Sequence, residues 1–229
     1  MGDDLAMTSY VLVHGVAHGG WCWSEVEQRL VDRGHDVVAV DLPLTSLEDD
    51  AAEVRRVLDA TSGPVVLVGH SYGGLVISRA AGDRTDVAHL VYVAAVMLDA
   101  DDPPGDRFAQ SPPTTLFQGD IFTEDGWLVV PPDLAVVAFF AECDPDTARA
   151  AAERLRPTAP ACLAFNAGAE PWRTVPSTYV LCERDQAIHP DFQRWMSTRA
   201  GTVVTFDTDH SPFFSMPDEL TDLLLSVAR

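Results

Sequence analysis

One serine of the chain stands where it could act as a nucleophile, in the stretch GHSYG (69–73). The apolar run Val65–Val68 precedes the stretch, and a segment with helical periodicity follows it. A nucleophile elbow requires this strand–turn–helix context, whereas the letters G-x-S-x-G alone often arise by chance. Glycines two residues to either side of Ser71 leave room for a strained turn. The motif predicts a hydroxyl held above a sheet beside a helix amino end, where negative charge is favoured; the alternative is an ordinary turn with a capping serine.

A serine hydroxyl is a poor nucleophile unless a base takes its proton, and the base in turn needs an orienting acid. In this topology the order along the chain is serine, acid, histidine. His210 lies in a loop after the apolar run Thr202–Phe206, and Asp185 directly follows the apolar run Ser177–Cys182. We therefore predict that Ser71, Asp185 and His210 form a catalytic triad.

Other residues are alternatives for the acid and the base. The second histidine candidate directly precedes a proline and opens a helix. Of the other acids, one lies two residues before Asp185, and two are too close to His210 in sequence to reach the far nitrogen of its ring comfortably. The alternatives are His189 for the base and Glu183, Asp207 and Asp209 for the acid.

Two backbone amides are expected to bind the negative oxygen that forms in acyl transfer. One belongs to the residue after the nucleophile, Tyr72, and the other to the loop after the first strand, HGVAHGG (14–20), where Val16 is the best candidate. His14 and His18 lie on a strand end and a glycine loop without a third ligand. We therefore predict no metal site and expect these histidines to shape the loop.

The composition excludes several classes of function. The net charge is −20, so nucleic acid and anionic membrane surfaces are not expected partners. All 15 basic residues are arginine. Because the chain has no lysine, Schiff-base catalysis, pyridoxal phosphate attachment and an ATP-binding P-loop are excluded. We expect no cofactor. The four cysteines have neither CxxC nor zinc-finger spacing, and we expect free thiols.

The same composition bears on location and size. No apolar run reaches the roughly 18–20 residues that cross a bilayer, and the first residues, MGDDLAMTSY, have no basic or apolar signal region. A cytoplasmic protein is therefore expected, and the arginine-rich, lysine-free composition is typical of high-GC bacteria. The length of 229 residues suits a single domain. Both a monomer and a homodimer are compatible with the sequence.

Apolar runs that alternate with helical patterns predict an α/β fold with a mostly parallel central sheet flanked by helices. The predicted strands are Tyr10–His14, Asp36–Val40, Val65–Val68, Val87–Ala94, Ser177–Cys182 and Thr202–Phe206. The predicted helices run from a capping box at Ser24 to Gly34, and over 47–60, 72–81, 191–199 and 218–228.

The alternation breaks between residues 98 and 173, which are rich in proline and aromatic residues and contain one clear helix near 144–155. We interpret this segment as a cap inserted into a core formed by 1–97 and 174–229. Aromatic residues of the cap and of the loop after His210 predict an apolar pocket. The lining candidates are Trp127, Phe139, Phe140 and Phe213, together with Phe117, Phe122, Phe165 and Phe214.

These residues carry a resemblance to the α/β-hydrolase superfamily, and within it to the branch of plant methyl esterases, hydroxynitrile lyases and many bacterial esterases. The similar stretches are VLVHGVAHGGWCW (11–23), VVLVGHSYGG (65–74), LVYVAAVMLD (90–99), YVLCERDQAIHPDFQRWM (179–196) and FDTDHSPFFSMPDELTDLL (206–224). The resemblance implies the same triad and the same pair of amides.

The resemblance also separates the branches. Hydroxynitrile lyases of this type carry threonine at the position of Gly15 and lysine after the triad histidine, where this chain has Ser211. Dehalogenases and epoxide hydrolases of this fold use an aspartate nucleophile. What remains is hydrolysis of a small to medium hydrophobic ester, such as an aromatic or methyl ester, through an acyl-enzyme. Two alternatives stay open: a thioesterase or polyketide-tailoring methyl esterase or cyclase, and a receptor-like ligand-binding protein with little turnover.

Overall fold

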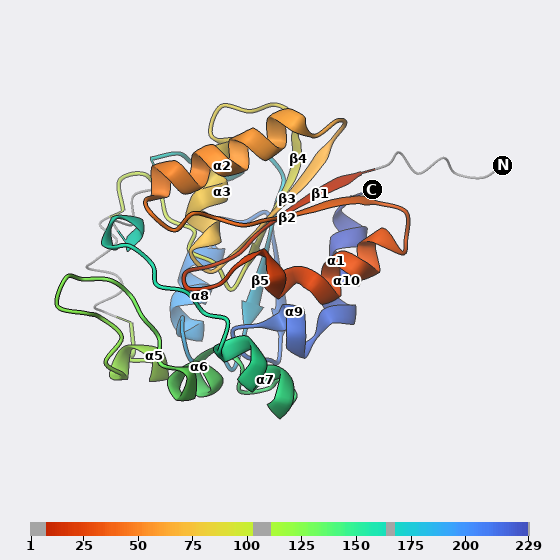
Figure 1. Cartoon of the computed structure of the whole chain (residues 1–229). Helices are drawn as coiled ribbons and strands as arrows, with labels where there is room; N and C mark the ends of the chain where they lie inside the picture. The colour runs from red at the N-terminus through yellow and green to blue at the C-terminus, as the bar shows by residue number, and fades with distance from the viewer. Residues whose placement is uncertain (1–7, 103–110, 164–167, 229) are drawn as a thin grey trace.

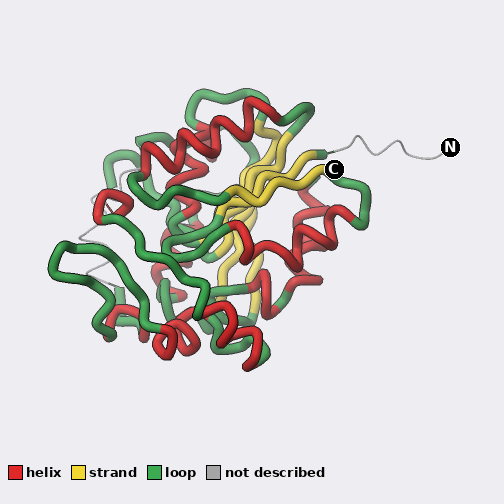
Figure 2. Tube along the Cα trace, viewed as in Figure 1, coloured by secondary structure: helices red, strands yellow, loops and turns green. Residues whose placement is uncertain are grey.

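A parallel sheet organises the molecule, whose computed structural model describes residues 8–102, 111–163 and 168–228. Six strands lie in the order β2-β1-β3-β4-β5-β6, and all neighbours are parallel (Figures 1 and 2). The expected α/β fold is confirmed, and each strand lies within two residues of its predicted limits. The strands are β1 Ser9–Val13, β2 Asp36–Val40, β3 Val65–His70, β4 Val87–Val93, β5 Ser177–Cys182 and β6 Thr202–Phe206.

Helices cover both faces of the sheet, because the inner strands are apolar on both sides. One face packs against α2 (Leu47–Ala60), α3 (Gly73–Ala81) and α8 (Pro190–Ser197). The other packs against α1 (Ser24–Val31) and α10 (Pro217–Val227), with the single turn α9 (Pro212–Ser215) beside them. Figure 1 shows α2 and α3 on one side of the strands and α1 and α10 on the other.

Helix α1 begins differently from the capping box expected at Ser24. A 3-10 turn, η1 (Gly20–Trp23), runs directly into the helix, and the capping position falls on Trp23, which makes no side-chain cap. Ser24 is therefore the first residue of α1. The start of the helix is fixed by packing instead, because the Trp23 side chain is fully buried and contacts Phe213. Packing of this tryptophan overrides the local capping signal.

The segment between β4 and β5 forms a cap at the carboxyl ends of the strands (Figure 1). Its described part contains the expected helix, α7 (Pro145–Ala152), whose first amides are capped by Asp144. It also contains α5 (Thr115–Gln118), α6 (Pro132–Phe139) and the 3-10 turns η2 (Pro160–Leu163) and η3 (Pro171–Arg173). The sequence PDLAVVAF of α6 is apolar on most sides and lacks the periodicity that would have predicted it.

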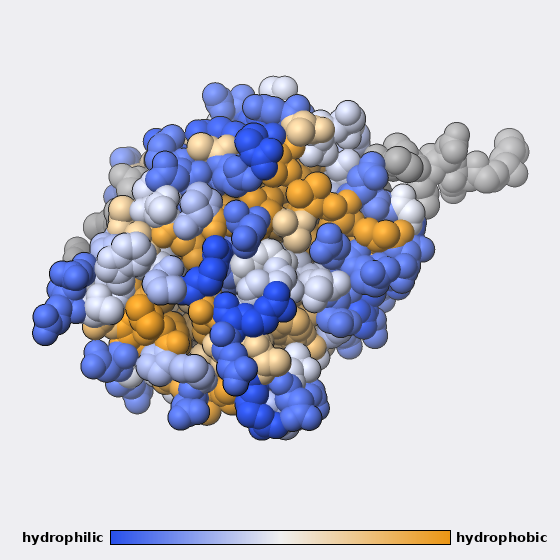
Figure 3. Space-filling view, viewed as in Figure 1, coloured by the Kyte–Doolittle hydropathy of each residue, from blue (hydrophilic) through white to orange (hydrophobic). Residues whose placement is uncertain are grey.

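The cap carries several exposed large apolar side chains. Among the described residues, most of the exposed large apolar side chains belong to it, and Figure 3 shows apolar colour both at the cap end and over the edge of the sheet. These side chains are Phe117, Phe122, Trp127, Val129 and Val137. Among the helices in the described ranges, none combines the length and the hydropathy of a membrane-spanning segment.

The turn between β3 and α3 is packed too tightly for side chains at its glycines. A Cβ atom on Gly73 would lie 2.7 Å from the carbonyl oxygen of Val13 and 2.8 Å from that of His14. A Cβ on Gly69 would lie 2.5 Å from the carbonyl oxygen of Gly73. The glycines of the motif therefore allow α3 to begin directly against strand β1.

We expect Gly73→Ala to lower the free energy of unfolding by about 1–3 kcal/mol, because the backbone of β1 cannot move away without distorting the sheet. Urea denaturation followed by circular dichroism measures the change. Gly201→Ala is the control, since its Cβ would come no closer than 3.3 Å to the Ser177 oxygen. Equal stability of the two variants would contradict the close approach of Gly73 to β1.

Candidate active site

Ser71 occupies the strained turn that the motif predicts. Its φ is +54°, in the left-handed region that residues with a Cβ seldom adopt. Three hydrogen bonds hold this backbone: the Ser71 amide donates to Val93 O at 3.1 Å, and its carbonyl accepts from Gly74 N at 3.0 Å and Val96 N at 2.9 Å. The strain is thus fixed from both the neighbouring strand β4 and the start of α3.

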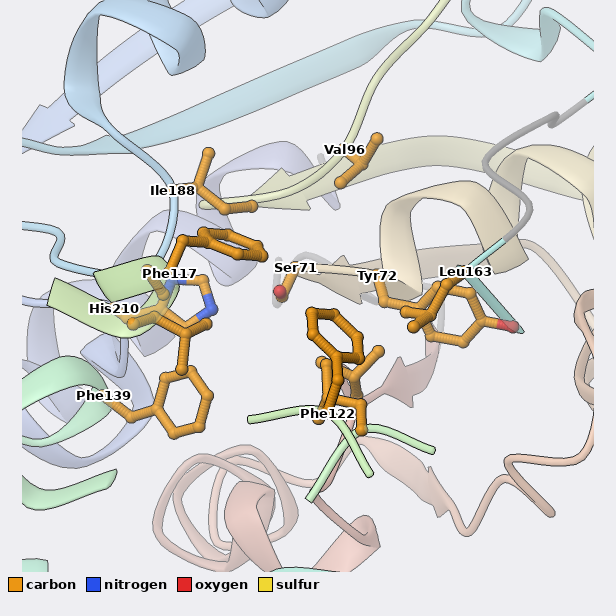
Figure 4. A pocket seen from close by; sticks show the side chains of 13 residues that line it. Ser71, Tyr72, Val96, Phe117, Phe122, Phe139, Leu163, Ile188 and His210 are labelled. Carbon is orange, nitrogen blue, oxygen red and sulfur yellow. The ribbon is translucent and has the colours of Figure 1, made fainter. Parts of the chain in front are cut away.

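Asp185 and His210 meet at the same end of the sheet, because each follows the carboxyl end of a parallel strand. His210 Nδ1 lies 2.7 Å from Asp185 Oδ2, and both side chains are almost fully buried. His210 shares a cavity with Ser71 (Figure 4). No hydrogen bond between Ser71 and His210 is found among the described contacts. The structure therefore brings the three predicted triad residues together, with the acid and the histidine already bonded.

Asp185 is held by more than His210. Its Oδ1 accepts from the amides of Ala187 at 2.7 Å and Ile188 at 2.8 Å. Its Oδ2 also accepts from Gln193 Nε2 at 2.7 Å, while Gln193 Oε1 accepts from Cys182 N at 3.0 Å. Gln193 is fully buried on α8. Sequence reasoning missed this glutamine, because nothing in its local pattern distinguishes it from an ordinary helix residue.

The alternatives for acid and base have other partners. His189 caps α8 by accepting from Asp191 N at 3.2 Å. The remaining acids bind elsewhere: Glu183 pairs with Arg194, Asp207 with Arg184, and Asp209 accepts from Glu142 N and Ser211 N. Asp209 is buried, and burial raises its pKa. Its bond to Glu142 ties the loop of His210 to the cap.

The loop after β1 is shaped by its two histidines, as the sequence suggested. His14 is fully buried; its Nδ1 bonds to Gly15 O at 2.8 Å and its Nε2 accepts from Leu42 N at 3.0 Å. His18 Nδ1 bonds to Val16 O at 2.8 Å. Burial lowers the pKa of His14 to about 4 and that of His18 to about 3, so both rings are neutral at neutral pH.

A strap of the cap, residues 156–159, holds the same loop from outside. The amide of Arg156 donates to Ala17 O at 2.7 Å, and its guanidinium donates to His18 O and Leu42 O. Thr158 Oγ1 accepts from Ala17 N at 2.9 Å. Ala17 has a φ of +61°, so the strap fixes a second left-handed residue next to Val16.

The two amides expected to form an oxyanion hole are available. Val16 and Tyr72 both line the cavity of Ser71. Within the described part of the chain, neither backbone N–H donates a hydrogen bond to another residue. Tyr72 is buried and Val16 is partly buried. A buried backbone N–H without an acceptor is rare in folded proteins, so a ligand oxygen is a natural partner for the Tyr72 amide.

The cavity that these groups share encloses about 120 Å³ and is almost entirely apolar. Figure 4 shows the hydroxyl of Ser71 among apolar side chains from the core and the cap. Ser71, Tyr72 and His210 are the lining residues with polar side chains, and the Tyr72 hydroxyl points away from Ser71. The other lining residues are Val16, Val96, Leu116, Phe117, Phe122, Leu128, Phe139, Leu163, Ala187 and Ile188.

The predicted pocket aromatics divide into two groups. Phe139 lines the cavity, and so do Phe117 and Phe122. The residues outside the lining are Trp127, which is 41% exposed, Phe140 and Phe213, which are buried, and Phe214. Phe213 packs behind the histidines, with its ring centroid 4.9 Å from that of His70, and Phe140 packs against His18 at 5.7 Å. Phe165 lies outside the described residues.

Metal ligands are not assembled in the described part of the chain. No group of three or more His, Cys, Asp or Glu side chains there is placed to hold an ion. The buried histidines near the site make hydrogen bonds to backbone groups instead, including His70, whose Nε2 lies 2.8 Å from His210 O.

Fold and site together define a hydrolase-type scaffold, with an elbow serine, a histidine–carboxylate pair and a cap over the carboxyl edge of the sheet. A profile of the alpha/beta hydrolase family matches residues 10–223, and the chain belongs to this family. The expected resemblance is thereby confirmed.

Two plant relatives are similar over nearly the whole chain. Methylesterase 9 of Arabidopsis thaliana is 30% identical, with 97% of this chain and 98% of the relative aligned. Methylesterase 7 of the same plant is 32% identical, with 99% and 98% aligned. The crystal structure of polyneuridine aldehyde esterase superimposes with a TM-score of 0.83 over 97% of this chain and 100% of that chain. At 22% identity, this likeness shows the shared fold.

Burial of neutral His14 makes stability depend on pH. Its pKa in the folded protein, about 4, lies below the ordinary value of 6.5, so only the unfolded chain binds the proton between these values. The contribution of His14 is complete above pH 6.5 and is lost as the pH falls toward 4, at up to about 1.4 kcal/mol per pH unit.

We expect His14→Gln to remove this slope, since its amide keeps a donor and an acceptor but does not titrate. Urea unfolding from pH 7 to pH 4 compares the two proteins, and groups common to both cancel in the difference. Parallel stability curves would show that His14 is not held neutral.

Proposed function

We propose that the protein is a serine carboxyl ester hydrolase that acts on small to medium hydrophobic esters through an acyl-enzyme. The observation that carries the proposal is the 2.7 Å bond between His210 and Asp185 in the cavity that also holds the elbow serine, Ser71. The names of the plant relatives, both methylesterases, support ester hydrolysis.

In the proposed mechanism, Ser71 Oγ attacks the ester carbonyl while His210 Nε2 takes its proton. The bond from Nδ1 to Asp185 leaves Nε2 free for this role and stabilises the imidazolium that forms. His210 then protonates the leaving alcohol as the carbonyl–oxygen bond breaks. Water, activated by the same histidine, hydrolyses the acyl-enzyme to the acid and restores Ser71. The approach of Ser71 to His210 tightens when substrate is bound.

The amides of Val16 and Tyr72 are proposed to bind the oxyanion of both tetrahedral intermediates. Support comes from their place in the cavity wall and from the absence of other acceptors within the described residues. Donors fixed before the reaction stabilise the developing charge without reorganisation, and one of them contributes about 2.7–4 kcal/mol. The bonds of the strap to Ala17 and His18 support such fixation for Val16.

We expect Ser71→Ala and His210→Ala each to lower kcat/KM for p-nitrophenyl butyrate at least about 10³-fold, because each removes a step of acyl transfer. A fluorophosphonate should add one covalent mass to the wild type and none to Ser71→Ala, as read by intact mass spectrometry. Ser226→Ala, on the exposed side of α10, is the control.

Three outcomes bear differently on the function. Turnover that survives Ser71→Ala would overturn the role of this serine. Labelling together with slow ester turnover, but fast turnover of butyryl thioesters, would favour the thioesterase. A wild type that neither labels nor turns over any short ester, yet binds one, would favour a receptor-like protein.

The apolar wall predicts discrimination against charged acyl groups. No charged side chain lines the cavity within the described residues, so a carboxylate in it would lose hydration without gaining a partner. We expect kcat/KM for p-nitrophenyl hemisuccinate to be lower than for p-nitrophenyl butyrate by roughly 100-fold or more. The methyl ester of the hemisuccinate, which has the same chain without the charge, is the matched control. Equal rates for the charged and methylated substrates would contradict this description of the pocket.

A further inference from the structure

A carboxyl group is buried beneath the turn that carries Ser71, outside the triad. Asp50 lies on α2 and is fully buried, as is the thiol of Cys162 beside it. The hydrogen-bond partners of Asp50 among the described residues are uncharged. Its Oδ2 accepts from the hydroxyl of Tyr72 at 2.8 Å, and its Oδ1 accepts from the amide of Leu44 at 2.7 Å. The Cys162 sulfur lies 3.6 Å from Oδ2.

This arrangement has an energetic cost that packing alone does not justify. Burial raises the pKa of Asp50, and only the donors around it oppose that shift. A carboxyl without a cation is expensive in an apolar interior, and an apolar pair of the same shape would often be more stable. The position of its main partner suggests what the carboxyl contributes instead.

Tyr72 connects the buried carboxyl to the reacting end of the site. Its backbone follows Ser71 directly, its ring lines the cavity, and its hydroxyl lies at the far end of the ring, away from Ser71 (Figure 4). The hydroxyl is thus too remote to contact the reacting atoms. A tyrosine bonded at its tip and joined to the elbow at its backbone has both ends fixed, so its side-chain and backbone torsions are constrained together.

Asp50 also constrains the loop that precedes α2. Leu44 has a φ of +57°, and its amide is held by Asp50 while its carbonyl accepts from Ala159 N at 3.0 Å. One carboxyl therefore joins α2, the loop after β2 and the residue that follows the nucleophile. The strap that supports the other amide, that of Val16, reaches the same loop.

We propose that Asp50 is a positioning residue that, through the Tyr72 hydroxyl, aims the Tyr72 backbone amide at the substrate oxyanion. The inference rests on the proposed function, since an oxyanion forms only if Ser71 attacks a carbonyl. It assigns the tyrosine hydroxyl a role in orientation, with no transfer of its proton.

The test compares Tyr72→Phe, Asp50→Leu and Asp50→Asn with the wild type, using p-nitrophenyl butyrate. We expect the first two to lower kcat about tenfold with KM changed less than about twofold, because a misaimed donor weakens binding of the transition state and not of the ester. Asp50→Asn keeps an acceptor for Leu44 and a donor for the Tyr72 oxygen, and it should retain at least about half of kcat.

A second measurement reports on the oxyanion itself. A butyl trifluoromethyl ketone adds to the serine and places a negative oxygen between the two amides. Its inhibition constant should rise about tenfold in Tyr72→Phe, in parallel with the loss of kcat, while that of the corresponding alcohol stays unchanged. If the bond between the Tyr72 hydroxyl and Asp50 had a purely structural role, its loss in Tyr72→Phe would not change the two inhibition constants differently.

Tyr92→Phe is the matched control. Tyr92 is another fully buried tyrosine, on β4, and its hydroxyl bonds to Ser78 Oγ at 2.9 Å without lining the cavity. Its loss should affect thermal stability but not kcat per labelled active site. If Asp50→Leu does not fold, the comparison of Tyr72→Phe with Tyr92→Phe still tests the proposal.

The outcomes distinguish the inference from the function on which it rests. If wild type turns over and Tyr72→Phe matches it, or falls only as far as Tyr92→Phe, the positioning role is overturned and the esterase stands. If Asp50→Asn is as impaired as Asp50→Leu, the orientation argument fails. A wild type without turnover or ketone binding overturns both.

Discussion

The left-handed backbone of Ser71 is the constraint around which the rest of the site is arranged. A residue with a Cβ adopts such a conformation only if its surroundings impose it. Here the neighbouring strand supplies the acceptor Val93 O and the segment after it supplies the donor Val96 N, while glycines on both sides clear the space. The parallel order of the sheet makes this possible, because β3 and β4 end at the same edge. The same edge then receives the loops of Asp185 and His210.

Buried polar groups form a second layer beneath this edge, and each is hydrogen-bonded to a residue of the site or of a loop next to it. Gln193 holds Asp185, His14 joins the first loop to Leu42, and Asp50 holds the ring of Tyr72. Such groups add little net stability, since their desolvation offsets much of what their hydrogen bonds contribute. Their common effect is to restrict the loops to one conformation, which is the condition for a site that is organised before substrate arrives.

The sequence was most informative where structure is periodic or where a motif fixes backbone geometry. The strands, the helix over 47–60 and the elbow of Ser71 follow from local patterns, and Asp185 and His210 follow from chain order combined with strand ends. The second layer could not be found in this way. Gln193 and Asp50 look like ordinary polar residues of amphipathic helices, and only tertiary packing turns them inward. For the same reason Phe140 and Phe213 looked like pocket residues, although they pack behind the histidines, because an aromatic residue near a site fits a cavity wall and a core equally well in sequence.

The bonds of Arg156 and Thr158 to the loop after β1 have a consequence for how such enzymes diversify. The cap segment that lines the cavity also supports the loop after β1. Leu128, in the cavity wall, pairs with Thr158, and Thr158 in turn accepts a hydrogen bond from Ala17 N. Replacing the whole cap would therefore also replace the residues that bind the loop after β1. Unless the new cap made equivalent hydrogen bonds, Ala17 would lose its partners. Changes in substrate range are accordingly more accessible through single side chains at the mouth, such as Phe117 and Phe122, than through exchange of whole caps. In this protein the cap therefore cannot be exchanged independently of the loop after β1.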